Sequence, residues 1–235
     1  MQPFRLQLVR LQPWRQWPGP EAVRASLADQ HDEPHGALAA AVSQALVRPA
    51  TLAIALGANL PSPAGGPADT LLAVRPLLEE QLHQWARAAL AELVDPSASG
   101  AAELRCSWSP LLQTAPVGGP PGQRDYTNGA LLVTLPAALA FQAADASAVS
   151  RLRRVGSSAL ALLKRLQQLE ARFGRPAQGE RRHWGPRSLD LDLLWWGEVV
   201  LDQPATVTTP ALQLPHPLWR QRPFVLEPLA ALMVL

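Results

Sequence analysis

The chain has 235 residues, 48% of them hydrophobic, which is enough to bury the core of one generous domain. Its formal net charge is only +2, and every cation except Lys164 is an arginine, a side chain suited to planar recognition of phosphate. For most surface arginines, however, the explanation that we favour is the composition bias of a GC-rich genome. The lone Cys106 excludes a disulfide framework, and no run approaches the roughly 20 apolar residues of a membrane helix. We expect a cytoplasmic protein without a membrane segment.

The N-terminal part of the chain lacks a regular hydrophobic period. Residues 1–48 are rich in proline, and we expect a poorly ordered extension there, followed by one domain over residues 49–235. A short helix is possible within the extension, over residues 36–47. We also expect that removing residues 1 to about 45 leaves the activity of the domain largely intact.

The first half of the domain alternates between strands and one long helix. A brief apolar run over residues 51–56, ended by Gly57, predicts a buried strand. Asp69 is expected to cap a long helix, which Pro76 should kink or delay. Further strands are expected over residues 104–108 and 126–135, on either side of a loop rich in glycine and proline.

The second half is expected to repeat this pattern. The polar residues 143–158 predict an insertion before a helix over residues 159–173. A strand from Leu189, a hairpin through residues 196–198 and a final helical segment from near His216 follow. Composition and periodicity indicate an α+β fold with an antiparallel sheet, and the order strand, helix, strand, strand, helix, strand is typical of ferredoxin-like folds.

Two carboxylates share one face of the strand that begins near Leu189. Strict alternation places Asp190 and Asp192 side by side, where like charges repel unless a cation lies between them. Mg²⁺ prefers such oxygen ligands, and arginines able to hold phosphoryl oxygens stand nearby, namely Arg175, Arg181, Arg182 and Arg187. The alternative is a pair of solvated acids on an exposed sheet face. The sequence contains no P-loop or kinase glycine loop, so a conventional nucleotide-binding fold is disfavoured.

Four segments resemble, in the same order, the motifs of the 6-hydroxymethyl-7,8-dihydropterin pyrophosphokinases of folate biosynthesis. They are His183–Leu194 (HWGPRSLDLDLL), Ala55–Leu60 (ALGANL), Gln113–Gly118 (QTAPVG) with Asp125–Asn128 (DYTN), and Leu214–Pro217 (LPHP) with Arg222–Leu226 (RPFVL). The resemblance runs from about Thr51 to the C-terminus. It implies a ferredoxin-like fold and an ATP-dependent diphosphokinase, a transferase that produces the pterin diphosphate and AMP.

The resemblance also implies roles for individual residues. The catalytic group would be Asp190, Asp192, Arg175 and Arg187, with Asp190 and Asp192 binding two Mg²⁺ ions. The ATP site would comprise Gln167, Glu170, Trp184, Leu193, His216 and Arg222. The pterin site would comprise Thr114, Ala115, Pro116, Val117, Tyr126, Asn128 and Phe224. His183 departs from the arginine usual in the family, so Arg181, Arg182 or His183 remains open for that loop role.

The expected partners are ATP and 6-hydroxymethyl-7,8-dihydropterin, bound by a monomer that contacts neither nucleic acid nor a membrane. By resemblance, MgATP binds first and the loops then close over the pterin site. Two other classes compete with this interpretation: a non-catalytic ferredoxin-like ligand-binding domain, and an RNA-binding domain suggested by the pI of about 9.3. Scattered aromatic residues argue against the RNA-binding class.

Overall fold

The computed structural model describes residues 35–93, 103–142, 149–176, 184–206 and 210–233. In chain order the elements are α2 (Gly36–Leu46), β1 (Thr51–Ala58), α3 (Pro67–Leu93), β2 (Arg105–Trp108), β3 (Leu112–Thr114), β4 (Tyr126–Thr134), η2 (Ala137–Leu139), α4 (Val149–Arg172), β5 (Asp190–Trp196), β6 (Leu201–Gln203), β7 (Leu212–Leu214), η5 (Trp219–Gln221) and α5 (Pro223–Ala231). None of the helices in these residues is long and apolar enough to cross a membrane.

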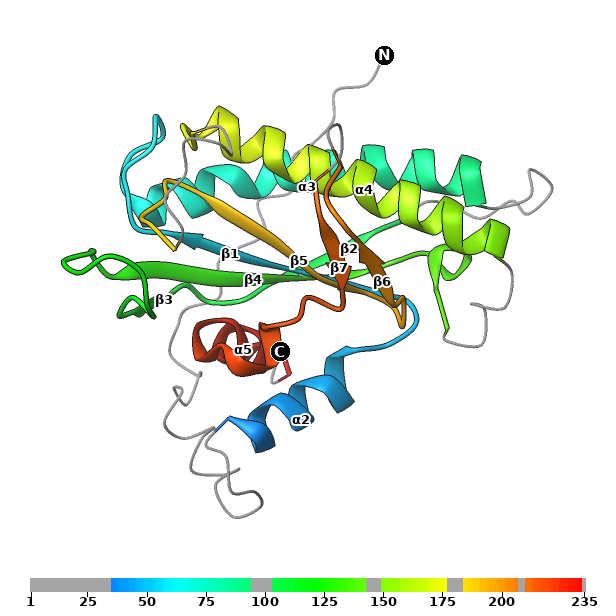
Figure 1. Cartoon of the computed structure of the whole chain (residues 1–235), viewed down its shortest axis with the longest axis horizontal. Helices are drawn as coiled ribbons and strands as arrows, with labels where there is room; N and C mark the ends of the chain where they lie inside the picture. The colour runs from blue at the N-terminus through cyan, green and yellow to red at the C-terminus, as the bar shows by residue number, and fades with distance from the viewer. Residues whose placement is uncertain (1–34, 94–102, 143–148, 177–183, 207–209, 234–235) are drawn as a thin grey trace, which may run out of the picture.

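The main sheet is antiparallel and has the strand order β2-β4-β1-β5, with β3 pairing with the outer part of β4. Strand β1 lies between β4 and β5 and pairs with both (Figure 1). Helix α3 connects β1 to β2 and α4 connects β4 to β5, which is the predicted ferredoxin-like order. The structure therefore confirms the α+β, ferredoxin-like prediction.

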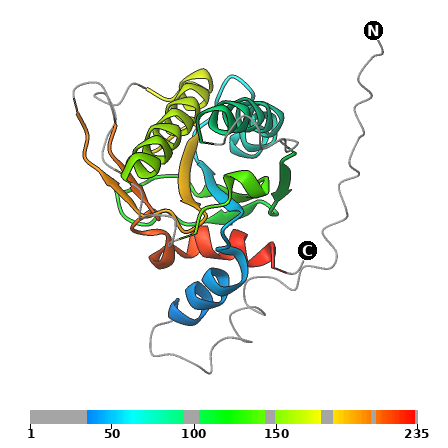
Figure 2. The same cartoon turned by 90° about the vertical axis from the view of Figure 1, so that its right-hand side faces the viewer.

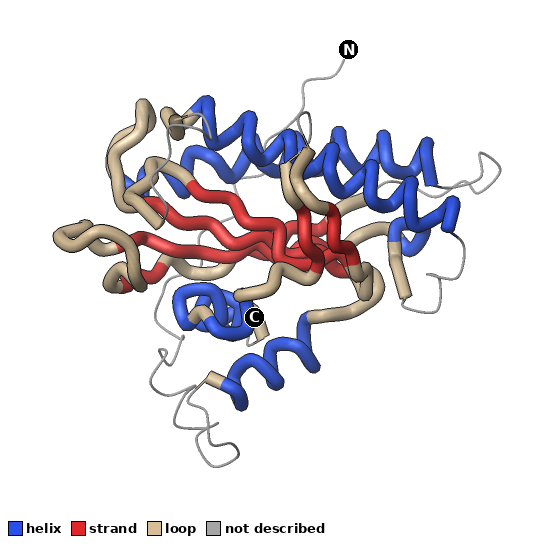
Figure 3. The backbone as a smooth tube through the Cα atoms, viewed as in Figure 1, coloured by secondary structure: helices blue, strands red, loops and turns tan. Residues whose placement is uncertain are grey.

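Helices cover both faces of the sheet. Helices α3 and α4 lie on one face, and α5 and α2 lie on the other, as both views of the ribbon and the tube trace show (Figures 1, 2 and 3). Each face has its own apolar core. The larger contains Trp85, Leu162 and Trp196, and the smaller contains Trp195, Trp219 and Leu229.

Strand β1 presents large side chains to one face and small ones to the other. Leu52, Ile54 and Leu56 belong to the core under α3 and α4, as side-chain alternation along a strand requires. Ala53, Ala55 and Gly57 face the α5 side. These small residues leave space between the sheet and α5, and the candidate site lies in that space.

Helix α2 lies within the segment that composition suggested to be poorly ordered. Its residues Leu38, Val42 and Leu46 are at most 7% exposed and pack in the core that contains α5. The possible helix over residues 36–47 is therefore confirmed, and this part of the extension is ordered because an apolar face of α2 covers α5. Residues 1–34 lie outside the described residues.

Three other details differ from the sequence-based expectations. Helix α3 begins at Pro67, so Asp69 lies in its first turn, where its Oδ2 accepts from the Gly66 N–H at 3.1 Å, and is not the residue before the helix. Helix α4 begins at Val149, so the polar segment 149–158 extends the helix and is not an insertion; residues 143–148 lie outside the described residues. Strand β6 pairs with β7 and not with β5, so the predicted hairpin through residues 196–198 is wrong. The chain does turn there, because the Val199 N–H donates to the Trp196 carbonyl, but β6 then leaves the main sheet.

Candidate active site

The candidate site forms where the loops preceding β4 and β5 meet the end of β1. Gly57 pairs with Asn128 of β4 on one side and with Asp190 of β5 on the other. Because both neighbours are antiparallel to β1, their first residues lie beside its last ones. This register brings the predicted pterin residue Asn128 and the predicted metal ligand Asp190 to one place, although 62 positions separate them in the sequence.

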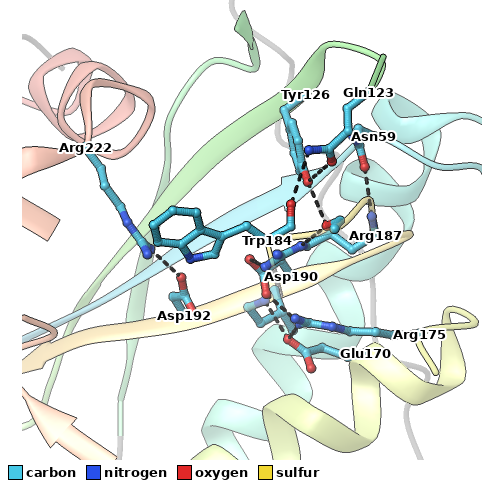
Figure 4. Close-up of polar contacts among 12 residues, drawn as sticks. Asn59, Gln123, Tyr126, Glu170, Arg175, Trp184, Arg187, Asp190, Asp192 and Arg222 are labelled. Atoms are coloured by element: carbon cyan, nitrogen blue, oxygen red, sulfur yellow. Dashed lines mark hydrogen bonds and ion pairs between the residues drawn. The ribbon is translucent and has the colours of Figure 1, made fainter. Parts of the chain in front are cut away.

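Three arginines hold the two aspartates. Arg175 and Arg187 each form an ion pair with a different carboxylate oxygen of Asp190 (Figure 4). The Arg222 guanidinium lies 3.2 Å from Oδ2 of Asp192. Since Leu191 and Leu193 are buried in the opposite core, the alternation of β5 turns both aspartates toward the α5 side. They are partly buried and paired, and are not the freely solvated acids of the alternative interpretation.

Burial and neighbouring charges shift the two carboxylates in opposite directions. Burial opposes ionisation of Asp190, but Arg175 and Arg187 outweigh it and lower the pKa of that carboxyl. Burial and the negative charge of Asp190 raise the pKa of Asp192 to about 6. A cation next to Asp192 would relieve this unfavourable charge.

A first cavity, at the end of β1, has a volume of about 320 Å³, within the usual range for small-molecule sites. All seven predicted pterin-binding residues line it: Thr114, Ala115, Pro116, Val117, Tyr126, Asn128 and Phe224. Five of the predicted catalytic or nucleotide-binding residues line it as well: Trp184, Arg187, Asp190, Asp192 and Arg222. The structure thus brings these twelve residues together around one space.

The polar groups of the first cavity are fixed by neighbours. Asn128 Nδ2 donates to Thr114 Oγ1 at 2.8 Å, which orients the amide in the cavity wall. Tyr126 donates to the Gly185 carbonyl at 3.1 Å and so joins β4 to the segment that leads into β5. On the opposite wall, the Arg222 guanidinium lies 5.7 Å from the centre of the Phe224 ring.

The second cavity, of about 480 Å³, lies beside β5, β6 and β7. It is lined by Asp192, Leu193 and His216, and Asp192 is the single residue that it shares with the first cavity. Burial, followed by the charge of Arg222, lowers the pKa of His216 to about 4. Because Nδ1 of His216 accepts from the Leu218 N–H at 3.2 Å, the neutral ring carries its proton on Nε2.

Three predicted residues line neither cavity: Gln167, Glu170 and Arg175. Glu170 is 3% exposed, forms an ion pair with Arg175 and accepts a hydrogen bond from the Leu191 N–H at 2.9 Å. It therefore fixes Arg175 and the start of β5. Arg181, Arg182 and His183 lie outside the described residues.

Sequence reasoning gave no role to Asn59 or Gln123. Asn59 accepts from the Arg187 N–H at 2.8 Å and donates to the Arg124 carbonyl at 3.1 Å. Gln123 lines the first cavity and donates to the carbonyls of Gly118 and Trp184. The motif ALGANL contains Asn59, whereas nothing in the sequence around Gln123 distinguished it.

The donor set fits Mg²⁺ bound together with phosphate. Asp190 and Asp192 offer hard oxygen ligands on one face of β5, and no third histidine, cysteine or carboxylate joins them among the residues that the structure describes. Mg²⁺ typically takes one or two carboxylates and fills its other positions with water and substrate phosphates. The pair thus suits a cation that arrives with a polyphosphate, and does not suit a fully protein-coordinated metal such as structural zinc.

The comparisons with known proteins agree with the family that the sequence motifs resemble. Residues 146–234 match the family model described as 7,8-dihydro-6-hydroxymethylpterin-pyrophosphokinase. A 2-amino-4-hydroxy-6-hydroxymethyldihydropteridine pyrophosphokinase of Synechocystis is 40% identical over 112 residues, which is 48% of this chain and 42% of that protein. The protein of the same name from Pseudomonas aeruginosa is 45% identical over 73 residues, 31% of this chain and 40% of that protein. The matches thus span about two fifths of the length of these relatives.

Proposed function

We propose that the protein transfers a pyrophosphoryl group from ATP to the hydroxymethyl group of 6-hydroxymethyl-7,8-dihydropterin, giving the pterin diphosphate and AMP. One observation carries this proposal: the seven expected pterin residues line a single cavity with both aspartates, and Asp192 also lines the second cavity. An acceptor in the first cavity and a nucleotide in the second would meet at Asp192.

The first cavity suits a flat ring edged with donors and acceptors. Tyr126 and Phe224 offer aromatic faces, which favour stacking. The amide of Asn128, oriented by Thr114, can offer both a donor and an acceptor to one edge of the ring. We therefore assign the pterin to this cavity, with Ala115, Pro116 and Val117 forming its wall.

The second cavity suits the nucleotide. Leu193 contributes an apolar wall, and the neutral ring of His216 can donate from Nε2 without adding charge. Arg187 and Arg222 lie next to the aspartates and are placed to neutralise phosphoryl oxygens. We also assign Gln167, Glu170 and Trp184 to the ATP site on the family resemblance alone, because Trp184 lines the first cavity and the other two line neither; Arg175 acts through Asp190.

The reaction forms one P–O bond, breaks another and releases the hydroxyl proton to solvent. The hydroxymethyl oxygen attacks the β-phosphorus of ATP, and the bond from that phosphorus to the oxygen bridging the α-phosphate breaks, so that AMP leaves. Asp190 and Asp192 would hold two Mg²⁺ ions, which supply Lewis-acid stabilisation of the phosphoryl oxygens. Arg187 and Arg222 position the reacting groups and neutralise charge, which is most of what a protein contributes to phosphoryl transfer. We propose that a cytoplasmic monomer does this, with the two substrates as its partners.

A product assay tests the proposal. The protein is incubated with MgATP and 6-hydroxymethyl-7,8-dihydropterin, and nucleotide products are separated by ion-exchange chromatography. AMP formed in equal amount to the pterin diphosphate supports the proposal. ADP as the product, or no turnover with both ligands bound, would overturn it. Salt-sensitive retention of RNA without turnover would favour the RNA-binding alternative.

A further inference from the structure

Asn59 is a buried polar residue at the point where the chain leaves β1. It is 1% exposed, and it follows directly after the strand that pairs with both β4 and β5. The loop over residues 117–125 ends at the start of β4, and the segment Trp184–Leu189 ends at the start of β5. The side chain of Asn59 therefore lies between two segments that each contribute residues to the first cavity.

All of the polar side-chain atoms of Asn59 are used to join these segments. Oδ1 accepts the Arg187 N–H at 2.8 Å, and Nδ2 donates to the Arg124 carbonyl at 3.1 Å. The backbone N–H of Asn59 also donates to the Arg187 carbonyl at 2.9 Å, so the Arg187 residue is held through both its N–H and its carbonyl. A buried amide with both ends satisfied rigidifies what it joins.

The two segments carry different halves of the proposed reaction. Arg187 forms an ion pair with Asp190, next to the proposed phosphate position. Arg124 directly precedes β4, and Gln123 and Tyr126, on either side of it along the chain, line the first cavity. Gln123 and Tyr126 also donate to carbonyls of this segment, but Asn59 is the buried side chain that bonds the Arg187 peptide itself. A shift of the Arg187 peptide is thus passed through Asn59 to the wall of the pterin cavity.

We propose that Asn59 is a positioning residue that couples nucleotide binding to completion of the pterin pocket. This inference rests on the proposed function. By linkage, a nucleotide that orders the Arg187 segment raises pterin affinity by the same factor as the pterin raises nucleotide affinity. We expect that factor to be at least about tenfold in the native chain, or about 1.4 kcal/mol.

The test compares pterin affinity with and without a non-hydrolysable MgATP analogue, by calorimetry, in the native protein and three variants. Asn59→Ala removes both side-chain hydrogen bonds, and Asn59→Asp keeps the acceptor for the Arg187 N–H but loses the donor to Arg124. Both variants are expected to reduce the coupling factor to within about twofold of one. The control is Thr51→Val, at the opposite end of β1, because the Thr51 hydroxyl is also buried and donates to the Leu46 carbonyl. It should lower stability and leave the coupling factor unchanged.

Native coupling in both Asn59 variants, or loss of coupling in Thr51→Val, would overturn the inference. Asn59→Asp has the size of the native side chain, so it carries the test if Asn59→Ala does not fold. Hydrogen exchange of the Arg187 amide gives a readout that needs no ligand: it should be slow in the native chain and in Asn59→Asp, and fast in Asn59→Ala. If the native chain binds neither ligand, the proposed function fails, and rapid exchange of the native Arg187 amide separately refutes the link through Asn59.

Discussion

Helix α2 is expected to stabilise the wall of the pterin cavity from outside the main sheet. Leu38 on this helix is 4% exposed and packs in the core that includes Trp219 and Val225. These two residues flank Arg222 and Phe224, which line the cavity. Replacing a buried leucine by alanine removes the burial of the lost methyl groups and leaves a cavity, at a typical cost of 2–5 kcal/mol.

For Leu38→Ala we expect the free energy of unfolding to fall by the lower part of that range, about 2–3 kcal/mol. Helix α2 packs on one side only, so it can move toward α5 and partly fill the cavity. For a chain of this length, that loss corresponds to a fall in melting temperature of roughly 5–10 °C. The assay is thermal unfolding followed by near-ultraviolet circular dichroism, with Gln44→Ala on the exposed face of the same helix as the control. The control should change stability by less than about 0.5 kcal/mol.

A truncation series extends this test to activity. Removal of residues 1–34 leaves every described contact of α2 in place and should leave turnover unchanged, whereas removal of residues 1–47 exposes the apolar surface of α5 and should reduce it. This replaces the expectation from composition that a cut near residue 45 is harmless. An unchanged melting temperature in Leu38→Ala, together with full turnover after removal of residues 1–47, would refute the reasoning.

Three further predictions concern the charged groups. Asp192→Ala should abolish AMP formation and keep the free energy of unfolding within about 1 kcal/mol of the native value, because the carboxylate is partly exposed at the cavity. The control is Asp69→Asn, at a residue that lines neither cavity, and near-normal turnover of Asp192→Ala at saturating Mg²⁺ would contradict the metal assignment. Because the pKa of Asp192 is raised to about 6, the affinity of the nucleotide-free protein for Mn²⁺ should fall about tenfold per pH unit below pH 6 and be constant above it. Electron paramagnetic resonance measures this affinity, and equal values at pH 5 and pH 7 would exclude the Asp192 carboxylate as a ligand. The pKa of His216 is lowered from 6.5 to about 4, so on acidification the imidazole of the unfolded chain is protonated first; the stability due to neutral His216 is complete above pH 6.5 and is lost between pH 6.5 and 4. Over that range, the free energy of unfolding in urea should depend less on pH in His216→Gln than in the native chain. The same pH dependence in both proteins would show that His216 does not titrate in this way.

Much of the fold could be predicted from local pattern, because β1 is a continuous buried apolar run and β5 alternates between apolar and acidic residues. The alternation of β5 and the apolar run of β1 predicted both strands, and the order of elements predicted the ferredoxin-like arrangement. Strand β3 has only three residues, too few for a period to emerge. The partner of β6 was mistaken because pairing depends on where the chain goes after Gly197, which local sequence does not determine.

The candidate site was predicted mainly by the family resemblance, and its assembly depends on register. Nothing in the residues near Asn128 indicates that it comes close to Asp190. The two residues pair with Gly57 from opposite sides, and this proximity can be deduced only once β1 is placed between β4 and β5. Asn59 and Gln123 escaped prediction for a different reason. Asn59 stands in a motif that resembles the family, but its role depends on a backbone amide and a backbone carbonyl of loops distant in the sequence, and the sequence does not indicate such partners. Gln123 likewise bonds backbone carbonyls only in the folded loop.

The division of β1 into a large-residue face and a small-residue face ties the cavity to the folding of the sheet. If one residue were inserted or deleted within β1, the side chains beyond that point would exchange faces. Ile54 and Leu56 would then fill the space beside Asp190, while Ala55 and Gly57 would leave voids beneath α3 and α4. A length change there would damage stability and ligand access together, so we expect β1 to tolerate substitutions that keep side-chain size but to accept no change in length.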